Sequence, residues 1–189
     1  MKEQIAIYGG TFDPIHTAHL EIIKYLSENY KKVLVVPTTV RYYKKNVCMF
    51  SFNYRLEAIQ EKIENLPNVE VLDIEREVGS NWRYIHTLAD IRLKYPNEKF
   101  VTVIGSDSLA NFETWYDYKD ILKHSELLVI KRPRYEIKEH DFDFEVVDSI
   151  NNDISSTKLR EELKDQMDRE FDEFLYDIGW ADKNIDNKE

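Results

Sequence analysis

Residues 5–20 read IAIYGGTFDPIHTAHL, an apolar run followed by two glycines, a proline and two histidines three positions apart. The apolar run is typical of a buried strand. The residues after it have the spacing of an amphipathic helix, with Leu20, Ile23 and Leu26 on one side. The polar residues in between therefore form a strand-to-helix crossover. In open parallel sheets, ligands bind at the carboxyl ends of strands, where such crossovers lie.

The same alternation of short apolar runs and longer helical patterns continues along the chain, which predicts a parallel sheet covered by helices. We therefore expect an α/β fold, a Rossmann-like open parallel sheet with helices on both faces, in a single domain over residues 1–189. Its C-terminal part is expected to be helical over 155–180, with a frayed tail at 181–189. The predicted strands are 4–10, 32–38, 69–75, 99–107 and 126–133, and the other predicted helices are 18–30, 52–66, 84–95 and 115–122.

The composition limits which classes of function and which cellular compartment are expected. A chain of 189 residues has the size of one ordinary domain. Its 26 basic and 36 acidic residues give a net charge of −10, which argues against a nucleic acid polymer as partner but not against a small phosphate ligand. Cys48 is the single cysteine, so no internal disulfide can form and a reducing cytoplasmic location is expected. No apolar run has the length of a membrane span, so no membrane partner is expected.

The crossover loop has the residue types of a phosphate site. Gly9 and Gly10 lack a Cβ, so the chain can turn sharply there and a ligand can approach the backbone. Thr11 and Phe12 then offer N–H groups to an anion. The loop follows neither the Walker pattern nor the GxGxxG fingerprint. An ordinary turn is the structural alternative.

His16 and His19 lie three positions apart at the expected start of a helix, where they share a face and the helix dipole favours negative charge. Two imidazoles in this place can bind a polyphosphate. Half of a metal site is the alternative, with a carboxylate such as Asp13 as a further ligand. Because zinc sites normally use at least three protein ligands, we expect no metal held by the protein itself.

The sequence GGTFDPIHTAH resembles the (H/T)xGH signature of the nucleotidyltransferase superfamily. Residues 104–133 and 154–163 resemble the later motifs of bacterial nicotinate-nucleotide adenylyltransferases in order, spacing and content, so that the resemblance spans about residues 5–163. The family implies a Rossmann-like enzyme of NAD biosynthesis that transfers AMP from ATP to nicotinate mononucleotide and releases pyrophosphate. Its acceptor is a phosphate that is already anionic, so catalysis would consist of positioning and charge stabilisation without a general base.

The resemblance implies a role for individual residues. His16 and His19 would be catalytic, Trp115 would stack on the pyridine ring and Lys44 would hold phosphate. The structural alternatives are a capping box at 155–157 with an exposed arginine behind it, an ordinary turn at 105–107, and a tryptophan in the core. The residues expected to bind ATP are Gly9, Gly10, Thr11, Phe12, Gly105, Asp107, Arg132, Ser155, Ser156, Thr157 and Arg160.

The chain departs from the family pattern at several places. Ala18 replaces the usual glycine between the histidines, and Arg41-Tyr42-Tyr43 replaces Pro-Pro-His before Lys44. The loop at 77–87 lacks the Ser-Tyr-Thr run that helps to recognise the pyridine carboxylate, and we interpret Arg83 as a partner for that carboxylate. Both nicotinate and nicotinamide mononucleotide therefore stay open as acceptors, and the acidic C-terminus receives no function.

Other functions are compatible with parts of the pattern. Phosphopantetheine adenylyltransferases and cytidylyltransferases share the histidine motif. The segment around Trp115 and the KRP at 131–133 argue against assigning the chain to either family. A nucleotide-binding regulator without turnover is an alternative of another class, but it would not need a group that stabilises leaving pyrophosphate. Mg²⁺ is expected to arrive with ATP and to be held by phosphate oxygens and water. A homo-oligomer is left open.

Overall fold

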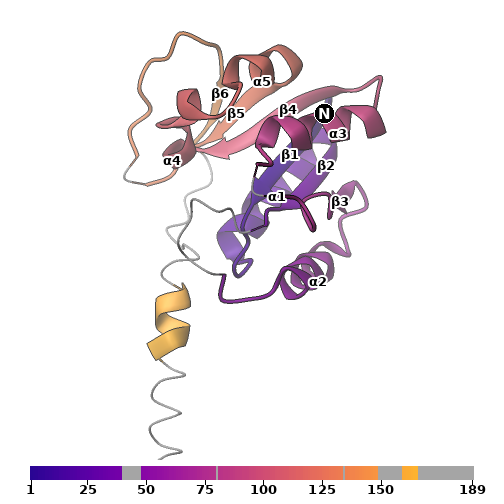
Figure 1. Cartoon of the computed structure of the whole chain (residues 1–189), viewed down its shortest axis with the longest axis vertical. Helices are drawn as coiled ribbons and strands as arrows, with labels where there is room; N and C mark the ends of the chain where they lie inside the picture. The colour runs from indigo at the N-terminus through magenta and orange to yellow at the C-terminus, as the bar shows by residue number, and fades with distance from the viewer. Residues whose placement is uncertain (40–47, 80, 134, 149–158, 166–189) are drawn as a thin grey trace, which may run out of the picture.

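The computed structural model describes residues 1–39, 48–79, 81–133, 135–148 and 159–165. Its centre is a single sheet of parallel strands with helices packed against both faces (Figure 1). The predicted α/β fold is therefore confirmed. That the domain includes the whole C-terminal part stays a prediction, since only residues 159–165 of the expected helical segment are described, and these are helical.

The six strands lie in the order β3-β2-β1-β4-β5-β6, and every neighbouring pair is parallel. The chain steps away from β1 on one side as far as β3, and then returns to the other side with β4. The order of the strands thus reverses between β1 and β4, which is where ligands bind in doubly wound sheets. The strands are β1 (Lys2–Gly10), β2 (Tyr30–Pro37), β3 (Val69–Val71), β4 (Lys99–Gly105), β5 (Glu126–Ile130) and β6 (Glu145–Val147).

The helices divide between the two faces of the sheet. Helices α1 (Thr17–Asn29) and α2 (Phe52–Ile63) pack on one face. On the other face lie α3 (Tyr84–Lys94), α4 (Ser106–Leu109), the 3₁₀ helix η1 (Phe112–Thr114) and α5 (Tyr118–His124). Among the described residues, none of the helices has the length and apolar character that crossing a bilayer requires.

Strand β1 is buried on both sides, as expected for the centre of a parallel sheet. Its side chains alternate, so that Ile5 and Ile7 belong to the core under α3, whereas Ala6 and Tyr8 belong to the core under α1. Burial on both faces fixes the position of the strand end, and with it the start of the crossover loop.

Several predicted boundaries were wrong. Residues 106–107 begin helix α4 instead of forming a turn, and β3 ends at Val71 rather than at residue 75. The predicted helix at 115–122 begins only at Tyr118, because Asp117 adopts a φ of 52°, in the left-handed region that a right-handed helix cannot use. Strand β6 was not predicted, since its three residues at the sheet edge are too short a pattern to identify.

Glu70 on the edge strand β3 joins three elements through its carboxylate. It accepts hydrogen bonds from Lys94 and Tyr95 at 2.6 and 2.8 Å, and Lys32 of β2 lies 2.6 Å away. Partial burial opposes ionisation, but the three donors outweigh it and lower the pKa of Glu70 to about 2. Since the folded pKa is below the unfolded one, the stabilisation is complete above about pH 4.5 and is lost as the pH falls toward 2.

We therefore expect Glu70→Gln to lower the free energy of unfolding at pH 7 by about 1 kcal/mol, a modest value because the side chain is partly exposed. Urea unfolding of wild type and variant measures this difference, which should shrink as the pH is lowered from 5 to 2. Glu57→Gln on the exposed surface of α2 is the control and should have no measurable effect. A Glu70→Gln difference that is independent of pH would contradict the assignment to charge.

Candidate functional site

The loop after β1 turns at Phe12 rather than at the two glycines. Gly9 and Gly10 are the last residues of β1 and neither has a φ in the left-handed region, whereas Phe12 has a φ of 47°. A Cβ on Gly10 would lie 3.1 to 3.4 Å from the ring of Phe12, which is tighter than an ordinary contact. The predicted turn at the glycines is therefore corrected: Gly10 makes room for the folded-back phenyl ring, and the strained residue is Phe12.

His16 and His19 stack on each other at the start of α1. Their ring centroids are 3.7 Å apart with an angle of 22° between the planes, and the ring of Phe12 packs edge-on against His19 at 4.9 Å. The backbone N–H of His16 donates to Nδ1 of His19 at 3.3 Å. In the neutral ring, Nδ1 of His19 is therefore the acceptor and Nε2 carries the proton. The ring of His19 thus offers one N–H donor, at Nε2, to a ligand.

Both imidazoles are neutral at pH 7. Burial lowers the pKa of His16 to about 4, and the charge of Arg132 adds to this effect. Burial also lowers the pKa of His19 well below its usual value, with contributions from His16 and Arg132. Nδ1 of His16 is buried without a hydrogen-bond partner among the described residues. The pair thus presents N–H and ring nitrogen groups, while the nearby positive charge comes from Arg132.

Arg55 fixes the loops that follow β1 and β2. It is only 2% exposed, and its Nη1 donates to the carbonyl oxygens of Thr11 and Thr38, the second at 3.0 Å. One charged donor thus joins the residues that follow β1 and β2, two neighbouring strands of the sheet. This burial means that Arg55 is not a solvated charge on the outer face of α2.

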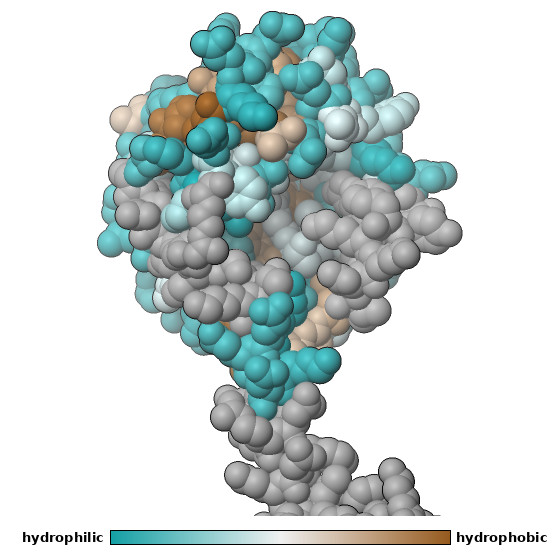
Figure 2. Space-filling view, turned by 90° about the vertical axis from the view of Figure 1, so that its left-hand side faces the viewer, coloured by the Kyte–Doolittle hydropathy of each residue, from teal (hydrophilic) through white to brown (hydrophobic). Residues whose placement is uncertain are grey.

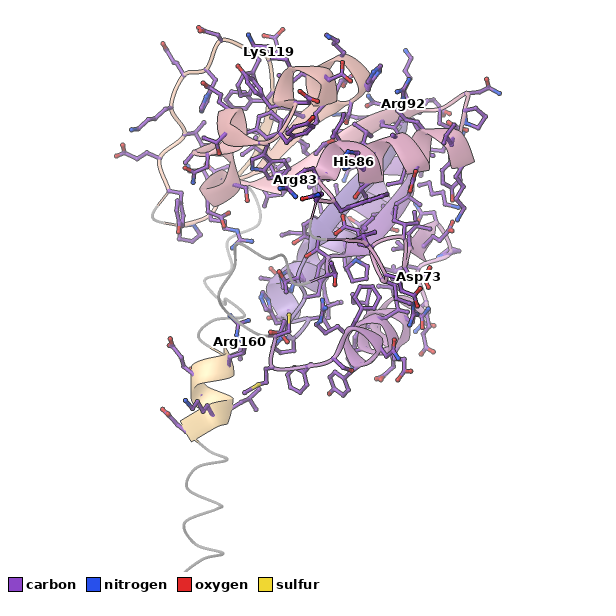
Figure 3. All side chains as sticks on the ribbon, in the orientation of Figure 1. Asp73, Arg83, His86, Arg92, Lys119 and Arg160 are labelled. Carbon is purple, nitrogen blue, oxygen red and sulfur yellow. The ribbon has the colours of Figure 1, made fainter. Side chains whose placement is uncertain are left out.

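Asp13 holds a second set of segments together. Its buried carboxylate accepts hydrogen bonds from the backbone N–H groups of Met49 and Phe50 at 3.0 and 2.9 Å. Its carbonyl oxygen accepts from Nη1 of Arg160 at 2.6 Å, and the same nitrogen lies 3.6 Å from the carboxylate. The contact places Arg160, which Figure 3 labels, next to the loop after β1. Arg160 is therefore not a purely solvent-exposed residue behind a capping box.

The start of α4, directly after β4, carries an ion pair. Nε of Arg132 lies 3.2 Å from Oδ1 of Asp107, and the backbone N–H of Arg132 donates to the hydroxyl of Ser106 at 3.0 Å. A Cβ on Gly105 would overlap the carboxylate of Asp107 and lie 2.7 Å from Nε of Arg132. Gly105 was expected to let a nucleotide approach, but the protein's own side chains fill this space, so a nucleotide that reaches Gly105 has to displace them.

A group of aromatic residues joins η1 to α3. The ring of Trp115 packs against Phe112 at 5.3 Å and against Tyr84 at 5.7 Å. Trp115 is half-buried and belongs to the margin of the core, so it has one part in the core and one part exposed. Arg83 is the N-cap of α3, and its Nη1 donates to the carbonyl oxygen of Trp82 at 2.7 Å.

Eight of the predicted site residues lie at the carboxyl ends of β1 and β4, namely Gly9, Gly10, Thr11, Phe12, His16, His19, Gly105 and Asp107. Pale and brown side chains, of intermediate to apolar hydropathy, are visible at the centre of the face that carries these strand ends (Figure 2). The role of Asp13 as an anchor was not predicted from the sequence, although its place directly after the glycine loop is a signal. Among the described residues, no cluster of three or more His, Cys, Asp or Glu side chains could hold a metal ion. The predicted residues Lys44, Ser155, Ser156 and Thr157 lie outside the described residues.

Comparison with known proteins agrees with this geometry. The profile of the cytidylyltransferase-like family matches residues 7–162. A Fusobacterium nucleatum protein named probable nicotinate-nucleotide adenylyltransferase is 32% identical over 87% of this chain and 90% of its own length. Proteins of the same name from Listeria welshimeri and Thermotoga maritima are 32% and 34% identical, over 87% and 85% of this chain and 88% and 82% of their own lengths.

Solved structures share the fold at lower sequence identity. The Plasmodium falciparum nicotinic acid mononucleotide adenylyltransferase in complex with NaAD superposes with a TM-score of 0.69 at 21% identity, covering 85% of this chain and 83% of that one. At this identity, the likeness establishes the same arrangement of strands and helices.

Proposed function

The chain belongs to the cytidylyltransferase-like family, and we propose that it is a nicotinate-nucleotide adenylyltransferase, which transfers AMP from ATP to nicotinate mononucleotide and forms deamido-NAD and pyrophosphate. This is a step of NAD biosynthesis. The use of ATP and the single cysteine favour the cytoplasm as its location.

The observation that carries this function is the position of the stacked imidazoles. His16 and His19 lie where the strand order reverses, between β1 and β4, and within the field of Arg132. A nucleotide that binds across such a switch point places its phosphates at the end of the first strand. Neutral N–H donors and a guanidinium at that place can stabilise the negative charge that grows on departing pyrophosphate.

The chemistry requires little from the protein apart from orientation and charge. An oxygen of the acceptor's 5′-phosphate attacks the α-phosphorus of ATP and forms a new P–O bond. The bond between the α-phosphorus and the oxygen that bridges the α- and β-phosphates breaks. Pyrophosphate leaves with the electron pair, and no proton has to be removed from the anionic nucleophile. Mg²⁺ is assigned only as the partner of the ATP phosphates, held by their oxygens and by water.

We assign the individual residues by their place around this reaction. His16 and His19 contact the phosphates, and Arg132 supplies positive charge beside them. Arg160 contacts the loop after β1, where its Nη1 donates a hydrogen bond to the carbonyl oxygen of Asp13. The other residues proposed to bind ATP are Gly9, Gly10, Thr11, Phe12, Gly105, Asp107, Ser155, Ser156 and Thr157, and Lys44, Arg83 and Trp115 are proposed to bind the acceptor.

The acceptor side favours nicotinate over nicotinamide. Arg83 lies at the N-terminus of α3, whose first turn contains no acidic residue, so both the guanidinium and the helix end favour a carboxylate. A hydrogen bond to a charged group is worth about 1.5 to 3 kcal/mol. The neutral amide of nicotinamide cannot form this charged pair.

We therefore expect pyrophosphate release from ATP to be at least tenfold more efficient, in kcat/KM, with nicotinate mononucleotide than with nicotinamide mononucleotide. Both acceptors are supplied at several concentrations to the same enzyme, and phosphopantetheine and ATP alone serve as controls. Pyrophosphate release only with phosphopantetheine would assign the chain to another member of the superfamily. Nucleotide binding without turnover would instead identify a regulator.

A further inference from the structure

A chain of hydrogen bonds leads from a buried carboxylate to the acceptor side of the site. Glu75 and Thr87 are 1% and 0% exposed, and the hydroxyl of Thr87 donates to Oε1 of Glu75 at 2.6 Å. The same hydroxyl oxygen accepts a hydrogen bond from the indole Nε1 of Trp82 at 2.9 Å. Because a threonine hydroxyl has one proton, the bond to Glu75 leaves its lone pairs for the indole. The three side chains therefore have one consistent arrangement of donors and acceptors.

The backbone of Trp82 continues this chain to Arg83. The carbonyl oxygen of Trp82 accepts a hydrogen bond from Nη1 of Arg83 at 2.7 Å. The backbone N–H of Arg83 donates to Nδ1 of His86 at 2.9 Å, and the rings of His86 and Trp82 are 5.2 Å apart. Because the carbonyl oxygen of Trp82 accepts the hydrogen bond from Nη1, a fixed indole of Trp82 also fixes the position of the guanidinium of Arg83. Arg83 and His86 lie close together at the start of α3 (Figure 3).

The link to Trp82 goes beyond what the core requires. A bond between Glu75 and Thr87 would by itself connect the segment after β3 to α3. Trp82, however, is only half-buried and precedes the helix, so its N–H could be hydrated if the protein did not bind it. The indole contact instead extends the buried network into the loop that differs from the family pattern.

We propose that Glu75 and Thr87 are positioning residues for acceptor recognition, which act by holding Trp82 and through it the guanidinium of Arg83. This role rests on the proposed function, since Arg83 is there the partner of the acceptor carboxylate. The residues hold no part of ATP. Their loss should therefore weaken the use of nicotinate mononucleotide and leave the use of ATP unchanged.

The test measures KM for nicotinate mononucleotide and for ATP in Trp82→Phe, Thr87→Val and Thr87→Ser. Trp82→Phe keeps the aromatic ring and the bond between Glu75 and Thr87, so the core stays intact. Removing one hydrogen bond should raise KM for nicotinate mononucleotide about fivefold to tenfold, with KM for ATP within about twofold. Thr87→Val should have the same effect, and Thr87→Ser should restore the wild-type value. Glu57→Gln, an exposed glutamate of α2 outside the 77–87 loop, is the control and should match wild type.

Three results would overturn the role. The first is an unchanged KM for nicotinate mononucleotide in Trp82→Phe, and the second is an equal rise in KM for both substrates. The third is a Thr87→Ser variant that behaves like Thr87→Val. Turnover of the wild-type enzyme, measured in the same series, separates the positioning role from the proposed function. If the wild type turns over nicotinate mononucleotide, these results overturn the positioning role alone. If it does not, the proposed function fails as well.

Discussion

Replacing His19 with alanine is expected to lower kcat/KM for adenylyl transfer by about 100-fold to 1,000-fold, because one oriented donor in a site that excludes water contributes about 3 to 4 kcal/mol to the transition state. The donor is the Nε2–H group, since Nδ1 of His19 accepts the backbone N–H of His16. Steady-state rates of pyrophosphate release at saturating nicotinate mononucleotide measure the effect.

The same substitution also removes packing. The ring of His19 is 8% exposed and contacts Phe12 and His16. We expect the alanine variant to lose about 2 kcal/mol in the free energy of unfolding, as for other buried side chains that are truncated. Rates are therefore compared at a temperature at which circular dichroism shows both proteins folded.

His124→Ala is the matched control for His19→Ala. His124 lies at the end of α5, where its Nε2 is 3.6 Å from the carboxylate of Asp120, far along the chain from the loop after β1. Its removal should leave turnover unchanged. If folded His19→Ala had activity within about tenfold of wild type, the imidazole would not be the group that stabilises the transferring phosphates.

The fold could be predicted from the sequence because the main signals are local. Apolar runs such as 99–105 and helical spacing such as that of α1 report burial directly, and the alternation of strands and helices then leaves few topologies. Strand β6 and the break at Asp117 could not be predicted in this way. Each depends on a few residues whose conformation is decided by neighbours from elsewhere in the chain.

The site was predictable to the extent that its chemistry is carried by one loop. His16 and His19 stand out because two histidines follow a glycine loop directly. Arg55 and Glu75 do not stand out, because a sequence marks both as charged residues of a polar surface. Their burial depends on partners distant in the chain, the carbonyl oxygen of Thr11 in one case and the hydroxyl of Thr87 in the other.

Arg55→Ala is expected to have the largest effect on stability and to weaken ATP binding as well. The substitution removes a buried side chain and leaves the carbonyl oxygens of Thr11 and Thr38 without their shared donor. Hydrogen bonds to a charged group contribute about 1.5 to 3 kcal/mol each, so the free energy of unfolding should fall by about 3 kcal/mol or more. Urea unfolding at pH 7 measures this loss.

The matched control is Arg92→Ala, because Arg92 is an exposed arginine of α3 (Figure 3). Its removal should change the free energy of unfolding by less than about 0.5 kcal/mol.

In Arg55→Lys, a single ammonium can reach one of the two carbonyl oxygens and keeps the charge, so about half of the lost stability should return. KM for ATP should rise in Arg55→Ala and partly recover in Arg55→Lys, because the loop of Thr11 leads directly to the stacked imidazoles. An Arg55→Ala variant as stable as Arg92→Ala would show that this guanidinium does not hold the two strand ends together.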